Sequence, residues 1–220
     1  DLLNKIKSGE IEANTYLPSE NELMKQYNAS RDTIRKSLNL LLHNGYIQKS
    51  KGKGSLVLDV NRISFPVSGV TSFKELEKTM HGKVNTIVTI FLESEVTEEI
   101  KKHLYMDQGH MYHIERIREI DGEKVILDID YLNAEVIKGL KLEHAQNSLY
   151  EYIEKELKLK ISFAKKEITV VKATKREKEL LDMKDYDLLV CVKSYTYLED
   201  ATIFEYTISK HRPDKFRFVD

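Results

Sequence analysis

The chain has 220 residues, a formal net charge of −1, 41% hydrophobic and 32% charged residues, which is typical of a globular protein of one large or two small domains. No apolar run is long enough for a membrane span and no signal peptide is visible, so we expect a cytoplasmic protein without a membrane partner. The single cysteine, Cys191, excludes disulfides within the chain and lies in an apolar run typical of a buried strand.

The first elements in chain order are a short helix and a helix pair. Residues 1–7 resemble the end of an amphipathic helix, and we expect further residues before them, because a full first helix is needed to cover the pair that follows. Ser19 after Pro18, with Glu22 three residues on, predicts a capped helix start. Asn28 interrupts that helix, and Ser30 caps a second one that runs to about Asn44. This spacing predicts a helix-turn-helix.

The second helix has an apolar face and a polar face. Its apolar face consists of Ile34, Leu38, Leu41 and Leu42, which we expect to pack on the rest of the domain. Outside that face lie polar residues in the first two turns, where a recognition helix meets the major groove of DNA. They are Arg31, Asp32, Thr33, Arg35 and Lys36.

Residues 46–49 and 55–58 read as two strands around a Ser-Lys-Gly-Lys-Gly turn, a wing whose glycines let backbone approach a ligand closely. Residues 25–54 hold seven Lys or Arg and one acid, a local charge of +6, so the remainder carries −7. A solvated helix face is the alternative, but the capped helices and the wing favour binding to double-stranded DNA. The predicted DNA contacts are Ser19, Arg31, Thr33, Arg35, Lys36, Lys51, Gly52, Lys53 and Gly54.

The domain boundary is predicted where periodicity is lost. Residues 59–66 end in proline and read as a linker between a first domain, 1–58, and a second, 67–220. The second domain alternates predicted helices with predicted strands, and an Asp-Gly pair at 121–122 indicates a hairpin, so we expect an antiparallel α+β domain. Helices are expected near 72–81, 96–104, 147–158 and 174–183, and strands near 84–92, 110–120, 123–133, 161–172, 187–198 and 201–211.

Two arginines share one face of the strand at 113–118. Period-two alternation places Arg116 and Arg118 beside Ile114, and Glu115 on the opposite face. Burying two guanidinium groups without acids or a ligand anion is costly, so this face is either a phosphate-binding pocket or an exposed charge ladder. The strand alone slightly favours the ladder.

Several longer motifs resemble a known family. Leu17-Pro-Ser-Glu-Asn-Glu-Leu23, Ser30-Arg-Asp-Thr-Ile-Arg-Lys36 and the Lys-Gly-Lys-Gly wing resemble the GntR family of bacterial winged-helix repressors. The second domain resembles the effector-sensing domain of the HutC subfamily, whose fold is like that of chorismate lyase. The motifs that carry this second resemblance are Thr71-Ser-Phe-Lys74, Glu115-Arg-Ile-Arg118, Asn147-Ser-Leu-Tyr150 and the segment from His211 to Phe218.

Within the subfamily, other segments resemble repressors of trehalose operons. They are Phe65-Pro-Val-Ser-Gly69, Asp121-Gly-Glu-Lys-Val-Ile-Leu-Asp128, Ser148-Leu-Tyr-Glu-Tyr-Ile153 and Asp214-Lys-Phe-Arg-Phe-Val-Asp220. The resemblance implies a homodimer on a palindromic operator, released when trehalose 6-phosphate enters the second domain, and no cofactor. It implies that Ser72, Phe73, Arg116 and Arg118 hold the phosphate, and that Asp128, Ser148, Tyr150, Glu205 and His211 meet the sugar. Many relatives carry glutamate at 128 and tyrosine at 211.

Alternatives remain at this stage. Tyr150 and Tyr152 can be core aromatics, Asp128 a solvated strand residue and His211 a surface imidazole. Arg212, Asp214 and Arg217 are expected to form a structural ion pair that secures the last strand. Another sugar phosphate, such as an amino-sugar 6-phosphate, is an alternative effector. The lyase-like fold makes an enzyme the competing class, against which stand the lack of a Ser-His-Asp arrangement, of metal-ligand spacing and of a nucleotide loop.

Overall fold

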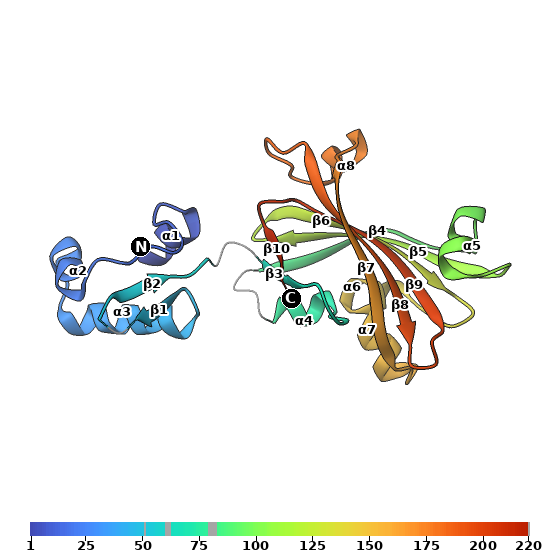
Figure 1. Cartoon of the computed structure of the whole chain (residues 1–220), viewed down its shortest axis with the longest axis horizontal. Coiled ribbons are helices and arrows are strands. Elements are labelled where there is room, and N and C mark those ends of the chain that lie inside the picture. Colours follow the sequence, from blue (N-terminus) through green and yellow to red (C-terminus); the bar gives the residue numbers. More distant parts are fainter. Residues whose placement is uncertain (51, 60–62, 79–82, 220) are drawn as a thin grey trace. The chain divides into compact units, whose positions relative to one another are not determined.

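The computed structural model describes residues 1–50, 52–59, 63–78 and 83–219. The chain forms two compact units, Asp1–Ile63 and Ser64–Asp220, drawn in Figure 1. Within the described part of the chain, no helix combines the length and the apolar composition that a membrane crossing requires.

The first unit contains three helices and a two-stranded hairpin. These are α1 (Leu2–Ser8), α2 (Glu20–Tyr27), α3 (Arg31–His43), β1 (Ile47–Ser50) and β2 (Gly54–Val57). The predicted capping box is present, since the N–H of Ser19 donates to Glu22 Oε2 at 2.8 Å and the N–H of Glu22 donates to Ser19 Oγ at 3.3 Å. Asn28 adopts a left-handed conformation and Ser30 accepts from the N–H of Thr33, so the predicted helix pair is confirmed.

One apolar cluster holds this unit together. Its members come from all three helices and the hairpin, and the largest fully buried ones are Ile6, Leu23 and Ile47. Leu38 and Leu41 are buried as predicted, whereas Leu42 is 37% exposed. The prediction for Leu42 was wrong because this residue lies at the edge of the apolar stripe of α3, where Tyr46 and Ile47 already close the core.

A six-stranded antiparallel sheet dominates the second unit. The strand order is β4-β5-β6-β9-β8-β7. The strands are β4 (Val84–Glu95), β5 (His110–Ile120), β6 (Glu123–Asn133), β7 (Ile161–Lys172), β8 (Leu188–Leu198) and β9 (Ile203–His211). The turn between β5 and β6 has positive φ at Asp121 (53°) and Gly122 (82°), which confirms the predicted hairpin.

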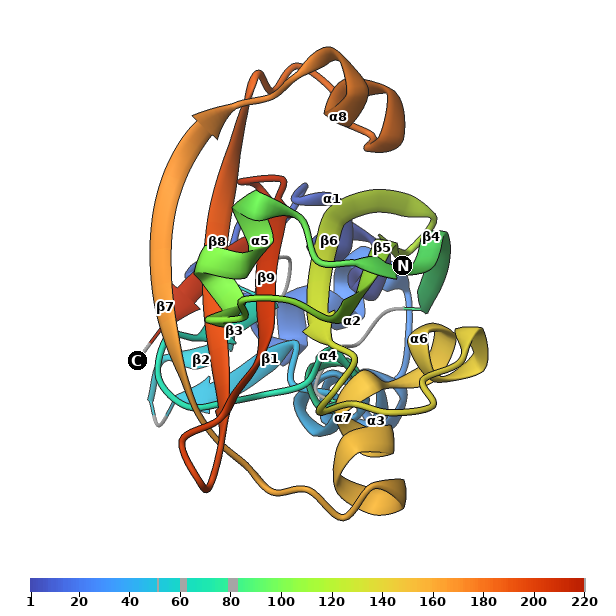
Figure 2. The same cartoon turned by 90° about the vertical axis from the view of Figure 1, so that its right-hand side faces the viewer.

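Helices pack on both faces of this sheet (Figure 2). On one face lie α6 (Leu142–Asn147), α7 (Leu149–Glu151) and the π-helical turn η1 (Tyr152–Glu156), in a core with Ile114 and Phe204. On the other face, α5 (Glu98–Leu104) and α8 (Lys175–Leu180) pack in two separate clusters. The sheet therefore leaves the central part of the first face free of helix, next to α7.

Four elements differ from the sequence-based expectation. Helix α6 was not predicted. Helix α4 (Phe73–Glu77) ends before residue 81, the expected end of this helix, and residues 79–81 of the expected helix lie outside the described part of the chain. Strands β3 (Ile63–Pro66) and β10 (Phe216–Val219) form a second, two-stranded sheet. The last four residues of the predicted linker thus belong to a strand, because Phe65 packs edge-on against the rings of His211 and Phe216.

Candidate functional site

The candidate DNA interface lies on α3, where Arg31, Thr33, Arg35 and Lys36 are all exposed. Arg31 contacts Glu20 at 3.5 Å and Lys36 contacts Asp32 at 3.0 Å. Arg35 has no ion-pair partner among the described residues. Its guanidinium is therefore the cation of this helix most available to a base or phosphate.

The two hydroxyls predicted to touch DNA already have hydrogen-bond partners at helix starts. Ser19 Oγ donates to Glu22 Oε2 at 2.8 Å, and this bond lowers the pKa of Glu22. Thr33 Oγ1 lies 2.9 Å from Ser30 Oγ at the start of α3. Either hydroxyl must exchange a local partner for a phosphate oxygen.

The wing requires its glycines for backbone conformation. Gly52 and Gly54 have φ of 78° and 100°, and a Cβ at either position would meet open space. Strain in the left-handed region, rather than a steric clash, therefore explains both residues. Lys53 is exposed at the tip, while Lys51 lies outside the described residues. Lys49 donates to Asn39 Oδ1 at 3.2 Å and ties the wing to α3.

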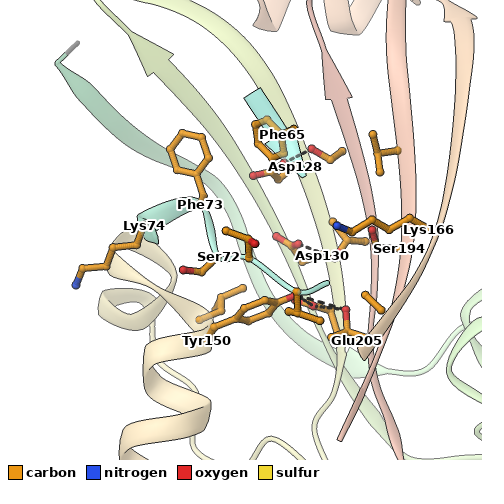
Figure 3. A pocket seen from close by; sticks show the side chains of 18 of the residues that line it. Phe65, Ser72, Phe73, Lys74, Asp128, Asp130, Tyr150, Lys166, Ser194 and Glu205 are labelled. Carbon is orange, nitrogen blue, oxygen red and sulfur yellow. Dashed lines mark hydrogen bonds between the residues drawn. The ribbon is translucent and has the colours of Figure 1, made fainter. Parts of the chain in front are cut away.

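A pocket opens on the face of the six-stranded sheet, in the part that α6 and α7 leave uncovered (Figure 3). Its walls come from β3 and α4 on one side, β5, β6, β8 and β9 below, β7 opposite, and α7 at one end. All nine residues predicted to bind the effector line it: Ser72, Phe73, Arg116, Arg118, Asp128, Ser148, Tyr150, Glu205 and His211. Segments far apart in the sequence are thus brought to one cavity.

The two arginines of β5 are buried and paired with carboxylates of β6. Arg116 donates to Asp130 Oδ2 from Nε at 3.1 Å and from Nη2 at 2.8 Å. Arg118 donates to Asp128 Oδ2 at 2.9 Å and to Thr86 Oγ1 at 2.8 Å. Arg116 is 8% and Arg118 is 2% exposed, so the interpretation of this strand face as an exposed charge ladder is wrong. The cost of burying both guanidinium groups is offset by acids directly across the strand pair.

These ion pairs keep both arginines charged near neutral pH. Burial and the neighbouring Arg116 lower the pKa of Arg118 to about 10. Although burial opposes its ionisation, Arg118 and Arg116 hold the pKa of Asp128 below its ordinary value. Asp128 is buried, which excludes a solvated strand residue there.

His211 is a buried, neutral member of the pocket wall and not a surface imidazole. Burial lowers its pKa to about 4. Ser209 Oγ donates to Asp128 Oδ1, so it accepts from His211 Nε2, which lies 2.9 Å away. The neutral ring then carries a lone pair on Nδ1, which has no hydrogen-bond partner in the part of the chain that is described. That nitrogen can accept a hydrogen bond from a ligand hydroxyl.

At the other end of the pocket, Glu205 accepts from two hydroxyls. Tyr150 donates to Glu205 Oε2 at 2.7 Å and Thr196 donates to the same oxygen at 3.1 Å. Burial and Asp130 raise the pKa of Glu205 to about 7, and burial raises that of Tyr150. Tyr152 instead packs in the core, as the alternative reading of that helix proposed. The Glu205 carboxyl can therefore carry or release a proton near neutral pH.

The start of α4 is engaged by its own helix. The N–H of Ser72 donates to Glu75 Oε2 at 2.7 Å and its hydroxyl donates to the same oxygen at 3.0 Å. The guanidinium of Arg118 lies 4.4 Å from the ring centroid of Phe73. Ser148 similarly caps α7 by accepting from the N–H of Glu151 at 3.2 Å. Contact of Ser72 with a phosphate requires that the Glu75 carboxylate give way.

Sequence reasoning missed several charged and polar residues of the pocket. Asp130 follows Asp128 by two on the same strand, so period-two alternation alone could have placed both on the arginine face. Lys166 lines the opposite wall, and nothing in the pattern of its own strand distinguishes it from the lysine before it. The polar lining that was not predicted also includes Thr71, Lys74, Asn147, Ser194, Thr196, Thr207 and Ser209.

The ending of the chain carries the predicted structural ion pair. Arg212 is fully buried and donates to Asp214 Oδ1 at 2.7 Å and to Glu123 Oε2 at 2.7 Å. These bonds join the end of β9 to the start of β6 and support the wall of the pocket beneath His211. The described residues include no group of His, Cys, Asp and Glu arranged to hold a metal ion.

Comparison with known proteins gives matches for both units. Residues 1–57 match the model of the bacterial regulatory proteins, gntR family, and residues 79–217 match the UTRA domain. The chain is 48% identical over 221 residues to the HTH-type transcriptional regulator TreR of Bacillus subtilis (strain 168), covering 100% of this chain and 93% of that one. It is 30% identical to the HTH-type transcriptional repressor NagR of the same strain, covering 99% and 90%.

Solved structures give the same result. The effector binding domain of the B. subtilis trehalose repressor (TreR) superposes with a TM-score of 0.58 at 46% identity, covering 62% of this chain and 95% of that chain. The possible transcriptional regulator YydK from B. subtilis subsp. subtilis str. 168 superposes with a TM-score of 0.63 at 25% identity, covering 100% and 94%.

Proposed function

Since the chain belongs to the gntR family of bacterial regulatory proteins, it is a transcriptional regulator, and we propose that it represses a trehalose operon until trehalose 6-phosphate enters its pocket. The family excludes the enzyme alternative that the lyase-like fold raised. The relative at 48% identity, TreR, is named the trehalose repressor in the structure of its effector binding domain. This name supports trehalose 6-phosphate as the proposed effector.

The observation that carries the proposal is the chemistry of the pocket. Arg116, Arg118 and Lys166 supply positive charge for a phosphate, as guanidinium and ammonium groups bind phosphate oxygens well. Carboxylates and hydroxyls of the same wall, including Asp128 and Glu205, suit sugar hydroxyls, which donate and accept. A pocket with both halves fits a phosphorylated sugar better than a free sugar or a free anion.

DNA binding is assigned to the first unit, with Arg35 and the wing as its main contacts. One winged helix reads only a half-site, so specific repression requires two chains. We place the two-fold interface in the second unit, which carries the acidic balance of the chain. Sedimentation of the full chain should give a dimer at micromolar concentration, and a strict monomer that binds operator one to one would remove this assignment.

A second candidate effector is an amino-sugar 6-phosphate. Glu205 favours it, because this buried carboxyl has hydroxyl partners and no cationic hydrogen-bond donor among the described residues, so a ligand ammonium could pair with it. The relative named NagR shares 30% identity. The two candidates differ in charge at the end of the pocket away from His211.

One titration separates these candidates. An operator fragment selected from random duplexes is bound to the full chain, and fluorescence anisotropy follows release on adding trehalose 6-phosphate, trehalose, glucose 6-phosphate or glucosamine 6-phosphate. We expect release by trehalose 6-phosphate at the lowest concentration, with little effect of trehalose. Release by glucosamine 6-phosphate at lower concentration would favour the second candidate, and no release by any of them would reject a sugar-phosphate effector.

A further inference from the structure

Lys166 is a pocket cation without an acidic partner. Its Nζ donates to the carbonyl oxygen of Pro66 at 3.0 Å, and no carboxylate lies within ion-pair distance of it in the described part of the chain. Figure 3 shows the side chain reaching into the pocket from β7, on the side opposite α4. A half-buried ammonium that contacts only a neutral carbonyl oxygen is under-compensated.

The other cations around the pocket are neutralised by the protein. Arg116 and Arg118 are paired with Asp130 and Asp128 at 2.8 and 2.9 Å. Lys74 is bonded to Glu151, and in Figure 3 its ammonium points away from the pocket. An incoming anion must therefore displace or share a carboxylate at each of these groups, but not at Lys166.

The surroundings of Lys166 make an anion the fitting partner. Burial lowers the pKa of this lysine, which means that its charged form lacks the stabilisation it has in water. Lys166 lies across from Ser194 of β8, whose hydroxyl lines the same pocket and can donate to the same anion. A phosphate bound here would satisfy the ammonium without breaking an ion pair.

The carbonyl that Lys166 holds belongs to the strand that follows the boundary between the units. Pro66 ends β3, which begins at Ile63, where the chain leaves the first unit. β3 pairs with the short strand β10, and its Phe65 ring packs edge-on against the rings of His211 and Phe216. The ammonium of Lys166 thus connects the pocket directly to the segment that leads to the DNA-binding unit.

We propose that Lys166 binds the anionic group of the effector and that this contact alters its hold on Pro66, so that occupancy of the pocket is transmitted to β3. The inference rests on the proposed function, since it assumes an anionic effector that changes DNA binding. It assigns the coupling to one side chain, whose three donors are shared between the ligand and the β3 carbonyl. A bond from the ammonium to an anionic phosphate oxygen is stronger than its bond to a neutral carbonyl oxygen.

The test replaces the charge and keeps the length of the side chain. Lys166→Met removes the ammonium, Lys166→Arg keeps a cation, and Lys165→Met is the matched control, since Lys165 is an exposed neighbour on the opposite face of β7. Calorimetric titration of each full-length protein with trehalose 6-phosphate and with trehalose gives two affinities. We expect Lys166→Met to lose about tenfold or more for the phosphorylated sugar only, with partial recovery in Lys166→Arg and none of these losses in Lys165→Met.

Three outcomes would overturn the inference. If wild type and Lys166→Met bind trehalose 6-phosphate with equal affinity, Lys166 does not contact the anion. If Lys166→Met loses the same affinity for both sugars, Lys166 shapes the pocket without binding the anion. Coupling is read as the ratio of effector affinities with and without operator DNA. An unchanged ratio in Lys166→Met removes the link to β3.

Inorganic phosphate separates this inference from the proposed function. If wild type fails to bind trehalose 6-phosphate, this sugar is rejected as the effector. Thermal unfolding can still measure how much inorganic phosphate stabilises wild type and the Lys166→Met and Lys165→Met variants. Stabilisation of wild type and Lys165→Met but not of Lys166→Met would support the anion contact independently of the sugar. Equal stabilisation of all three would reject it.

Discussion

Arg116 and Asp130 form a two-pronged ion pair inside the candidate pocket, with Nε and Nη2 of the arginine at 3.1 and 2.8 Å from one carboxylate oxygen. The other carboxylate oxygen accepts from Thr207 Oγ1 at 3.0 Å. The pair joins β5, β6 and β9, so Arg116 has a structural role in addition to any contact with a ligand.

Arg116→Ala should therefore lower the stability of the second unit. Removing one partner of a buried pair leaves the other charge uncompensated, which costs about 3–5 kcal/mol. Urea denaturation of wild type, Arg116→Ala, Asp130→Ala and the double variant measures this cost, and we expect the double variant to lose less than the sum of the two single variants. An Arg116→Ala variant as stable as wild type would show that the pair is not formed.

Glu205 should make stability depend on pH in a definite direction. Its pKa in the folded chain is about 7, above the ordinary value of 4.5, so the folded state binds a proton that the unfolded state releases. This contribution is full below pH 4.5 and is lost as pH rises toward 7. Glu205→Gln removes that loss, so between about pH 5 and about pH 8 the variant should gain about 2–3 kcal/mol relative to wild type.

Denaturation curves of both proteins at the two pH values give the Glu205 difference. His211, whose pKa is lowered to about 4, titrates in the opposite sense, but it is present in both proteins and cancels. A difference between variant and wild type that stays constant with pH would show that Glu205 is ionised throughout.

Arg35 and Lys53 should affect DNA binding in different ways. Arg35→Ala should weaken operator binding by roughly 1–3 kcal/mol if the side chain reads a base, with less effect on unrelated duplexes. Lys53→Ala should weaken all duplexes about equally and reduce the slope of affinity against salt by about one. Anisotropy titrations at several salt concentrations measure both, with Lys175→Ala as control, since that side chain is 93% exposed in the other unit. Wild-type binding by both variants would remove the predicted interface.

Phe65 should matter for coupling more than for binding. Phe65→Ala removes a ring whose centroid lies 5.0 Å from that of His211 and 5.6 Å from that of Phe216. This change loosens β3 from the pocket wall. We expect the ratio of operator affinities with and without effector to fall toward one, from a typical range of about 5–150. Phe163→Ala is the control, because that ring stacks on Tyr197 at 4.5 Å on the opposite face of the sheet. A full response of Phe65→Ala to the effector would show that β3 does not transmit the signal.

Most of the secondary structure was predictable because its signals are local. The capping boxes at Ser19 and Ser72 and the Asp-Gly hairpin at 121–122 depend on residues within four positions of each other. Strand β3 was misread as linker, since what makes Ile63–Pro66 a strand is pairing with β10 near the far end of the chain. Short strands of this kind carry too few residues for periodicity to reveal them.

The sequence by itself determined the two-domain organisation, the helix-turn-helix and the residues that resemblance assigns to the effector. Each of these follows from short motifs whose meaning does not depend on distant contacts. The nine residues that resemblance assigned to the effector line one cavity, and their contact with a ligand stays a prediction.

Only the tertiary structure decided whether the charges of that cavity are free. The sequence shows Arg116 and Arg118 on one strand face, but their carboxylate partners lie on the next strand, and their distances depend on the register between β5 and β6. Lys166 has no sequence signal at all, because its importance comes from the absence of such a partner within the described pocket and from the Pro66 carbonyl across it. Electrostatic balance is a property of three-dimensional neighbours, and strand pairing is what creates those neighbours.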